Sequence, residues 1–485
     1  MESEEDIFFK VQNLREEFVI LLKAAMKDGL AKVADAVASK RYIGTYYQWP
    51  SISFRDNGLP NLSSSSFQGV KEYRNCFGRN ENKIVESDIA SFVNYFNFVE
   101  SNEDLKSRLF IKQWCEIDDY KFPDFKAIIV YSMIKDSIER YIHLYDTFEY
   151  VEENARLVID EIENFVFLET LSIDIVIPIL FIDFEFESYS LSDGIVIRRL
   201  TNNEHLARYN IKSYNVSVHE SVLASATHAV VFKDWIVKNA PCAMEFNTLH
   251  NTRAYPIDQI NRFFASVRLV KNVSTGYAQI FSLAKNWISD CKAGLPHVLG
   301  TTTRSYPANF EDYYWNIESV PLISNSEMST IHRLFDLLSN AEENSIDLSV
   351  KRLNQCLVRD SEEDSVLDAT IALEALLSDD GTQEMTHKLA MRVGALANLD
   401  ESFGKTPQQA FKDIKNIYAY RSAIVHGSKK LDKKRIIKLE DNKEATTHSL
   451  AVEYLRFVLK VILENPQYRD PKKIDSELLL GGNQG

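Results

Sequence analysis

The amino-acid sequence predicts an α+β protein, in which a mixed α/β N-terminal region is followed by an all-α C-terminal bundle of helices. Two observations lead to this prediction. Runs of β-branched and aromatic residues gather in the middle of the chain, and beyond Ser324 they give way to amphipathic segments joined by short loops. We expect four parts: a mostly helical region 1–170, a mixed α+β domain 171–323, a helical bundle 324–470 and a flexible tail 471–485.

The composition is that of a globular protein with more than one domain. The chain has 485 residues, of which 45% are hydrophobic and 26% are charged. Its net charge of -15 means that the molecule as a whole does not coat nucleic acid, so any contact with RNA requires a local basic patch. The five cysteines are far apart and form no CxxC pair, which argues against a disulfide framework and a zinc knuckle and favours a reducing compartment.

The sequence gives no sign of export or of membrane insertion. The first ten residues, "MESEEDIFFK", are acidic and lack the apolar core of a signal peptide. The longest conspicuous apolar run, Ile175 to Ile182, is too short to cross a bilayer and is typical of a strand. We therefore expect a cytoplasmic protein with no membrane partner.

The N-terminal region begins with a helical pattern over about residues 4–37. The serine-rich stretch "NLSSSSF" at 61–67 predicts a loop. From Ser87 to Asn164 the pattern is again mostly helical, with tyrosine-rich apolar faces.

The middle region carries the strand signals. "IDIVIPILFIDFEFESYSLSDGIVIRRL" predicts two strands with a turn at Asp193-Gly194. "THAVVFKDWIVKN" and "STGYAQIFSLAKNW" predict further strands on either side of a helix at about 256–270.

The last third of the chain predicts an antiparallel bundle, because short loops join most of its helices. "DDGTQ" and "DESFGKTP" supply the glycine and proline that end and begin helices. The expected helices cover about 326–340, 345–358, 361–378, 384–398, 407–426 and 443–464.

The common catalytic motifs are missing from the sequence. There is no P-loop, no GxGxxG and no GxSxG, and Leu223 stands where the second histidine of an HExxH string beginning at His219 would be. Most of the ten histidines are isolated, which is typical of structural or surface residues. We therefore expect no metal and no cofactor.

The stretch "YAYRSAIVHGSKK", Tyr418 to Lys430, places a cation inside an apolar stripe. At about 100° per residue Arg421 falls near the centre of an arc that holds four apolar residues. A guanidinium keeps its proton, so it must meet an anion there, or face a cleft or another chain. The apolar residues of the stripe are Ile414, Ile417, Ile424 and Val425.

The end of the same helix predicts an exposed histidine followed by positive charge. His426 is the expected last helical residue, and Gly427 is a natural stop. From Arg421 to Lys438 there are seven lysines and arginines against one aspartate. A patch of this kind suits RNA, although a solvated loop beside the negative end of the helix dipole explains it equally well. The candidate RNA-binding residues are Lys429, Lys430, Lys433 and Lys434.

A carboxylate is also expected on a buried helix face. In "DSVLDATIALEALLS", Glu374 falls inside the apolar arc and Asp368 falls outside it. A buried carboxylate needs a cationic partner, and the candidates are Arg421 and Arg392. We expect Glu374 to hold structure and position, with a purely structural ion pair as the alternative.

Three segments, "DATIALEALL", "HKLAMRVGAL" and "IYAYRSAIVHG", resemble successive helices of an Apea-like HEPN domain, over roughly residues 345–465. The most specific part is Arg-Ser-x-Ile-Val-His-Gly, from Arg421 to Gly427. The resemblance implies an all-α, usually dimeric domain, which in many members is a metal-independent RNase of prokaryotic antiviral defence or toxin systems. Ser422 is typical of the Apea-like branch, where HEPN nucleases at large often carry Asn, Asp or His.

The expected function is therefore that of a metal-independent endoribonuclease. His426 would move a proton and Arg421 would hold the phosphate, supported by Glu374, Ser422 and Arg392. One histidine does not easily serve both proton transfers, and on an ideal helix Arg421 and His426 point about 140° apart, so we expect a homodimer that pools two copies of each.

Two alternatives stay open for this domain. One is a catalytically silent HEPN module that acts as a dimerisation or RNA-binding scaffold. The other is a toxin held by an antitoxin. In the RNase interpretation, residues 1–323 sense or restrain, and a phage-derived molecule is a possible trigger.

Overall fold

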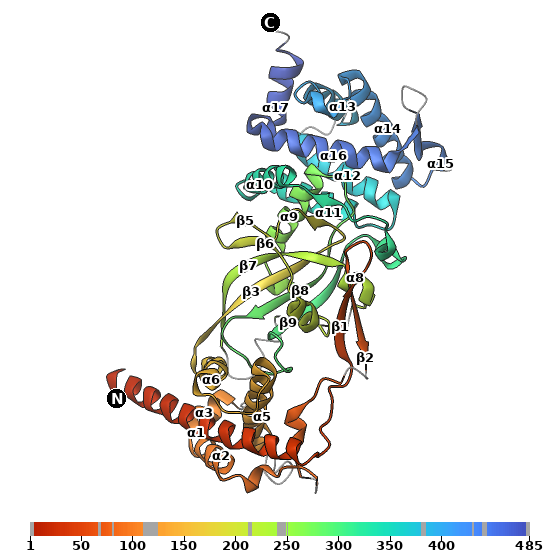
Figure 1. Cartoon of the computed structure of the whole chain (residues 1–485). Helices are drawn as coiled ribbons and strands as arrows, with labels where there is room; N and C mark the ends of the chain where they lie inside the picture. Colours follow the sequence, from red (N-terminus) through yellow and green to blue (C-terminus); the bar gives the residue numbers. More distant parts are fainter. Residues whose placement is uncertain are drawn as a thin grey trace. The chain divides into compact units, whose positions relative to one another are not determined.

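The structure is a computed structural model. It describes residues 4–65, 69–79, 82–109, 125–211, 216–239, 249, 251–379, 385–428, 431–438 and 444–481. The chain is α+β, as the sequence predicts: its first and last segments in sequence are helical, and residues between them form an antiparallel sheet (Figure 1).

The chain separates into two compact units, each made of three segments. Unit 1 comprises Met1–Pro178, Ser188–Tyr255 and Gln279–Thr303, and unit 2 comprises Ile179–Glu187, Pro256–Ala278 and Arg304–Gly485. The region predicted as one mixed domain, 171–323, thus supplies residues to both units.

The helices of unit 1 follow the predicted pattern and share one apolar core. Helix α1 (Glu4–Ala38) packs against α2 (Ala90–Ser101), α5 (Phe125–Tyr145) and α6 (Glu152–Phe167), with α3 (Glu103–Leu109) beside α2 and α6. The core is rich in aromatic rings, of which Phe18, Phe92 and Tyr95 are fully buried.

The largest sheet has six strands in the order β5-β6-β7-β3-β8-β9 and lies mainly in unit 1, while one end each of β3, β8 and β9 belongs to unit 2. β5 (Ser188–Ser192) and β6 (Ile195–Arg199) form a hairpin that turns at Asp193-Gly194, which confirms the predicted turn. β7 (Ala226–Lys238), β3 (Thr170–Leu180) and β8 (Tyr277–Ala284) occupy three of the predicted strand regions. The sequence did not predict β9 (Val298–Ser305), since "VLGTTTRS" lacks an apolar alternation.

The serine-rich stretch predicted as a loop at 61–67 is a strand as far as Ser65, and residues 66 and 67 lie outside the described residues. Strand β2 (Pro60–Ser65) pairs with β1 (Trp49–Phe54) in an antiparallel hairpin. Leu62 is buried against Tyr209 and Ala224 of the same unit, and this burial together with backbone pairing outweighs the weak strand propensity of serine.

Unit 2 is mainly helical. Its longer helices are α9 (Ile257–Val270), α10 (Asn325–Ser339), α11 (Asn344–Cys356), α12 (Glu362–Leu377), α13 (Met385–Leu396), α14 (Pro407–Val425) and α16 (Thr447–Glu464). These bounds lie close to those predicted. Ser324 and Glu327 form a capping box at the start of α10, so a local signal fixes where the series of helices begins after the sheet.

Helix α9 belongs to the core of unit 2 although it lies before residue 324 in the chain. Ala265 and Leu269 are buried in the same apolar cluster as the residues of α12, α14 and α16. Arg456 of α16 donates from Nε to the carbonyl of Arg268 at 2.6 Å. A bundle bounded at 324 therefore lacks one of its own helices.

The chain stays ordered beyond the predicted boundary at 470. A short helix, α17 (Pro471–Lys473), is followed by a turn of π-helix over Ile474–Leu479. Ile474 is fully buried in the apolar cluster of unit 2. This packing fixes residues that the sequence suggested to be flexible.

Within the described residues, no helix is both long and apolar enough to cross a lipid bilayer. Three of the cysteines lie in this part of the chain, and all three are buried free thiols: Cys76, Cys291 and Cys356.

Candidate active site

The candidate site lies at the C-terminal end of α14, and the sequence fixes both ends of this helix. Thr406 and Gln409 form a capping box around Pro407, which occupies the first helical turn. Ile414 and Ile417 are fully buried, whereas Val425 is 58% exposed. The apolar stripe of α14 thus runs out of the core toward solvent, and Arg421 lies where it emerges.

His426 caps α14 and is exposed. Gly427 follows with a φ of 58°, in the left-handed region that favours glycine. The N–H of Gly427 donates to the carbonyl of Ile424 at 3.2 Å, and that of Ser428 donates to Ala423 at 2.9 Å. These two bonds form a Schellman motif, which confirms the predicted stop and holds the imidazole at an open helix end.

Arg421 is only loosely paired. Its Nη2 lies 3.4 Å from Oε1 of Glu374, the long end of the range for an ion pair, and the two side chains are 34% and 27% exposed. Its Nε is buried and has no hydrogen-bond partner in the structure. Of the two partners predicted for Glu374, the structure selects Arg421. The guanidinium retains donors for a further anion.

Tyr418 is a member of this cluster that the sequence analysis missed. It lies one turn before Arg421, and the guanidinium carbon of Arg421 is 6.0 Å from the centre of its ring. Its hydroxyl donates to the carbonyl of Thr370 at 3.3 Å. Burial and then the charge of Glu374 raise the pKa of Tyr418 well above its usual value, so the phenol stays neutral. The signal in the sequence was the three-residue spacing from tyrosine to arginine.

The burial predicted for α12 is partly wrong. Asp368, expected outside the apolar face, is only 3% exposed and is bound by Arg352 and Arg359. Glu374, expected on the buried face, is half-buried. The reason is that α12 packs against α11, α14 and α16 at once, so most of its circumference is covered.

Arg392 lies on α13 and does not join this cluster. Its Nε and Nη2 donate to the carboxylate of Asp475 at 2.9 and 2.6 Å, Nη2 also reaches Asp379 at 2.8 Å, and Nη1 donates to the carbonyl of Leu377. The side chain is 2% exposed. All three guanidinium nitrogens of Arg392 are hydrogen-bonded, so this side chain links α13 to the end of α12 and to the C-terminal segment.

Part of the basic segment after α14 is held in contacts within the protein, which its charge alone did not suggest. Helix α15 (Leu431–Lys434) leads into a small hairpin of β11 (Ile436–Lys438) and β12 (Glu444–Thr446), which the sequence did not predict. Lys433 is exposed, but Nζ of Lys434 donates to the carbonyl of Ala419 in α14 at 3.0 Å. Lys429 and Lys430 lie outside the described residues. Ser422, in contrast, is exposed on the last turn of α14.

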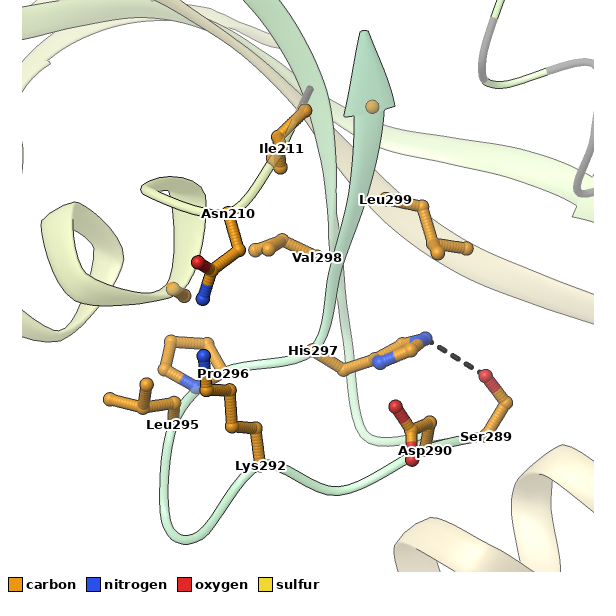
Figure 2. A pocket seen from close by; sticks show the side chains of 12 residues that line it. Asn210, Ile211, Ser289, Asp290, Lys292, Leu295, Pro296, His297, Val298 and Leu299 are labelled. Carbon is orange, nitrogen blue, oxygen red and sulfur yellow. Dashed lines mark hydrogen bonds between the residues drawn. The ribbon is translucent and has the colours of Figure 1, made fainter. Parts of the chain in front are cut away.

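Unit 1 contains a separate cavity of about 340 Å³ beside β9 (Figure 2). Its wall includes His297, whose Nε2 is 2.9 Å from Oγ of Ser289. The pair resembles a nucleophile and its base. Burial lowers the pKa of His297 to about 4, so the ring is neutral at neutral pH but a weak base. We therefore treat the pair as a structural hydrogen bond.

Among the described residues there is no group of three or more His, Cys, Asp or Glu placed to hold a metal ion. No protein-family model matches the chain, and neither a curated protein nor a solved structure shows significant similarity to it. The interpretation of the site therefore depends on the chemistry of its own residues.

Proposed function

We propose that the protein is a metal-independent endoribonuclease of the HEPN type, and that it acts in the cytoplasm as an antiviral defence or toxin effector. The observation that supports this most directly is the end of α14, where a loosely paired arginine and an exposed histidine lie five residues apart. Both belong to the Arg-Ser-x-Ile-Val-His-Gly segment.

The chemistry follows from the substrate. RNA carries its own nucleophile, the 2′-hydroxyl next to the scissile phosphate, so the enzyme has to move protons and stabilise charge. His426 accepts the 2′-hydroxyl proton or donates one to the leaving 5′-oxygen. Arg421 donates to the phosphate oxygens as negative charge builds on them. The products are a 2′,3′-cyclic phosphate and a 5′-hydroxyl.

Glu374 and Tyr418 position Arg421 in this scheme. Glu374 attracts the guanidinium from α12, and the ring of Tyr418 lies along its side. Neither contact uses all of its donors. Ser422 lies on the exposed face next to Arg421, where it contacts substrate backbone, and Arg392 supports the fold of the helices rather than the site.

A homodimer completes the site in this proposal. A single histidine does not readily act as both base and acid, and a second copy of α14 supplies the other. Val425, the last helical residue of α14, and Ile436, the first residue of β11, are 58% and 51% exposed, which gives the partner apolar side chains to cover. Residues 1–323 then restrain the pairing until an antitoxin leaves or a phage-derived trigger binds.

The cleavage test uses the full-length protein in EDTA with a single-stranded RNA and a structured RNA loop. We expect cleavage with cyclic phosphate ends, and no cleavage of the matching DNA. His426→Ala should abolish cleavage, and His387→Ala is the matched control because His387 is another exposed histidine of unit 2. Full activity of the His426→Ala protein, or a strict need for added Mg²⁺, would refute the proposal.

The dimer test mixes an Arg421→Ala chain with a His426→Ala chain. Neither parent should cut RNA, and the mixture should recover part of the activity because each mixed dimer keeps one copy of each group. Full activity in a sample that is monomeric by light scattering would exclude a shared site.

The scaffold alternative makes a different forecast. A silent HEPN module binds RNA and dimerises, but no condition or trigger makes it cut. The presence of both Arg421 and His426 favours the enzyme, since RNA binding alone needs the cation but not an exposed histidine five residues after it.

A further inference from the structure

Unit 2 contains a second polar feature away from the end of α14, a cavity of about 260 Å³ formed by α9, α11 and the adjoining ends of β8 and β9. Three of its lining residues are cations, and none is a carboxylate. Its charged and amide side chains are Asn261, Arg268, Arg304, Lys351, Asn354 and Gln355. A cavity with this lining attracts an anion.

Arg268 is the deepest of the three cations. It is 3% exposed, its Nη2 donates to the carbonyl of Thr275 at 2.7 Å, and its Nη1 donates to the side-chain oxygen of Asn354. Both acceptors are neutral. Its Nε is buried without a partner, and no carboxylate of the described chain contacts the guanidinium. Burial lowers the pKa of Arg268 to about 10, so the group still carries its charge at neutral pH.

An isolated buried charge of this kind is costly, because desolvation is not balanced by an opposite charge. Arg392, equally buried in the same unit, is balanced by two aspartates. The ring of Phe264, 5.7 Å from the guanidinium carbon of Arg268, compensates only in part. An anion that enters the cavity would supply the opposite charge that Arg268 lacks.

The other two cations of the cavity are more exposed. Arg304 and Lys351 are 55% and 53% exposed, and their contacts with carboxylates are long, at 3.8 Å to Glu311 and 3.5 Å to Asp258. Arg304 also hydrogen-bonds the neutral side chain of Tyr306. Exposed ion pairs of this kind contribute little. One buried guanidinium and two exposed cations suit a ligand with more than one negative charge.

We propose that this cavity is a binding site for a phosphate group, either free phosphate or the phosphate of a small nucleotide, with Arg268 as its buried anchor and Arg304 and Lys351 as its outer cations. The lining amides of Asn261 and Gln355 supply neutral hydrogen bonds to the rest of the ligand. This site does not depend on RNA cleavage.

Binding is tested on the full-length protein by calorimetry and by thermal unfolding, with inorganic phosphate, pyrophosphate and AMP as separate probes in a chloride buffer. We expect saturable binding of at least one probe and a rise of Tm with its concentration. Tighter binding of AMP than of phosphate identifies a nucleotide as the ligand, whereas equal affinities identify the phosphate group alone.

The variants assign binding to this cavity. Arg268→Met should abolish saturable binding. Arg304→Ala and Lys351→Ala, which change exposed side chains and leave the fold intact, should each weaken it about tenfold. Arg333→Ala, which removes a comparably exposed arginine of α10, is the matched control and should not change affinity.

Two results would overturn the proposal. One is the absence of saturable binding of all three probes by the wild-type protein. The other is equal weakening by Arg333→Ala and by the two cavity variants, which would mean general charge screening. If Arg268→Met fails to fold, Arg304→Ala and Lys351→Ala still decide the question.

Discussion

Arg392 and Arg421 lie on α13 and α14, which pack against each other, yet their surroundings are opposite. The side chain of Arg392 is 2% exposed and all its nitrogens are bonded, two of them to Asp475. The side chain of Arg421 is 34% exposed, with one long ion pair and an unbonded Nε. The sequence offered the two arginines as alternative partners of one carboxylate, Glu374, and the structure pairs Glu374 with Arg421.

The difference teaches how to separate a structural arginine from one that awaits a ligand. Position on an apolar face does not separate them, since both sequence patterns place the arginine among apolar residues. The number and the charge of the hydrogen-bonding partners distinguish the two arginines. By this measure Arg268 belongs with Arg421, because its buried charge meets only neutral oxygens.

The largest effect should follow from Arg392→Met. This change leaves Asp379 and Asp475 without their cation, and removing one partner of a buried ion pair costs about 3–5 kcal/mol. Urea unfolding measures the loss, with Arg333→Met as the exposed control, for which we expect about 0–1 kcal/mol. If Arg392→Met lowers the free energy of unfolding no more than the control does, Arg392 does not have the structural role that distinguishes it from Arg421.

Arg421→Met should have the opposite profile. We expect RNA cleavage to fall about 100-fold or more, as when one donor to a developing oxyanion is removed. Unfolding free energy should change by less than about 1 kcal/mol, because the pair with Glu374 is long and partly exposed. A stability loss as large as that of Arg392→Met would make Arg421 structural.

The features predicted correctly at this site come from local signals. Thr406, Gln409 and Gly427 mark the ends of α14 through bonds that span three to five residues. The periodicity of α12 predicted that Glu374 needs a cationic partner, but it left Arg421 and Arg392 open, and the structure selects Arg421. Sequence patterns carry such information because the partners share one helix or one turn.

The features that were missed depend on contacts far along the chain. Arg392 finds Asp475 eighty-three residues later, which no periodicity encodes. Asp368 is buried because α11, α14 and α16 pack around α12. A helical wheel of α12 alone identifies one apolar face and does not show that neighbouring helices also cover the polar side. Strand β9 is held by its neighbour in the sheet rather than by its threonines.

Glu374→Gln tests the positioning of Arg421 with a smaller change. The substitution keeps the shape of the side chain and removes its charge, so the guanidinium of Arg421 loses the electrostatic attraction that positions it. We expect the kcat for RNA cleavage to fall about tenfold with little change in KM, whereas a purely structural pair would leave kcat per folded molecule unaltered. Steady-state kinetics at matched folded concentrations decides between the two.

Gly427→Ala should cost about 1 kcal/mol, since a side chain at a φ of 58° is strained. Gly404, with a φ of 68°, is a matched control in the same unit. Both variants should lose similar stability in urea, but only Gly427→Ala should slow RNA cleavage, because it tilts His426. Equal rates in the two variants would separate His426 from the reaction.

The smallest effect is expected in the basic segment. Lys433→Ala should lower the salt dependence of RNA binding by about one charge, because Lys433 is exposed. Lys434→Ala should change this slope less, since its amine is bonded to Ala419. Binding measured over a series of salt concentrations compares the two, and equal slopes would place both lysines at the phosphate backbone.

The packing of α9 into the core of unit 2 limits which fragments of the protein can fold. A fragment that begins near Ser324 looks like a natural way to release the helical bundle, but it removes Ala265 and Leu269 from the core that α16 completes. Such a fragment exposes apolar surface and loses the bond from Arg456 to α9. Inactivity of such a fragment would therefore not test the proposed RNA cleavage.

The same helix sets an order of events on the ribosome. Helix α9 ends at Val270 and α16 begins at Thr447. At a translation rate of about 5–20 residues per second, α16 is therefore synthesised roughly 10 s or longer after α9. During that interval the apolar face of α9 is a natural contact for a chaperone. The apolar core of the unit that carries Arg421 and His426 is therefore complete only after α16 has been synthesised, later than both α9 and α14.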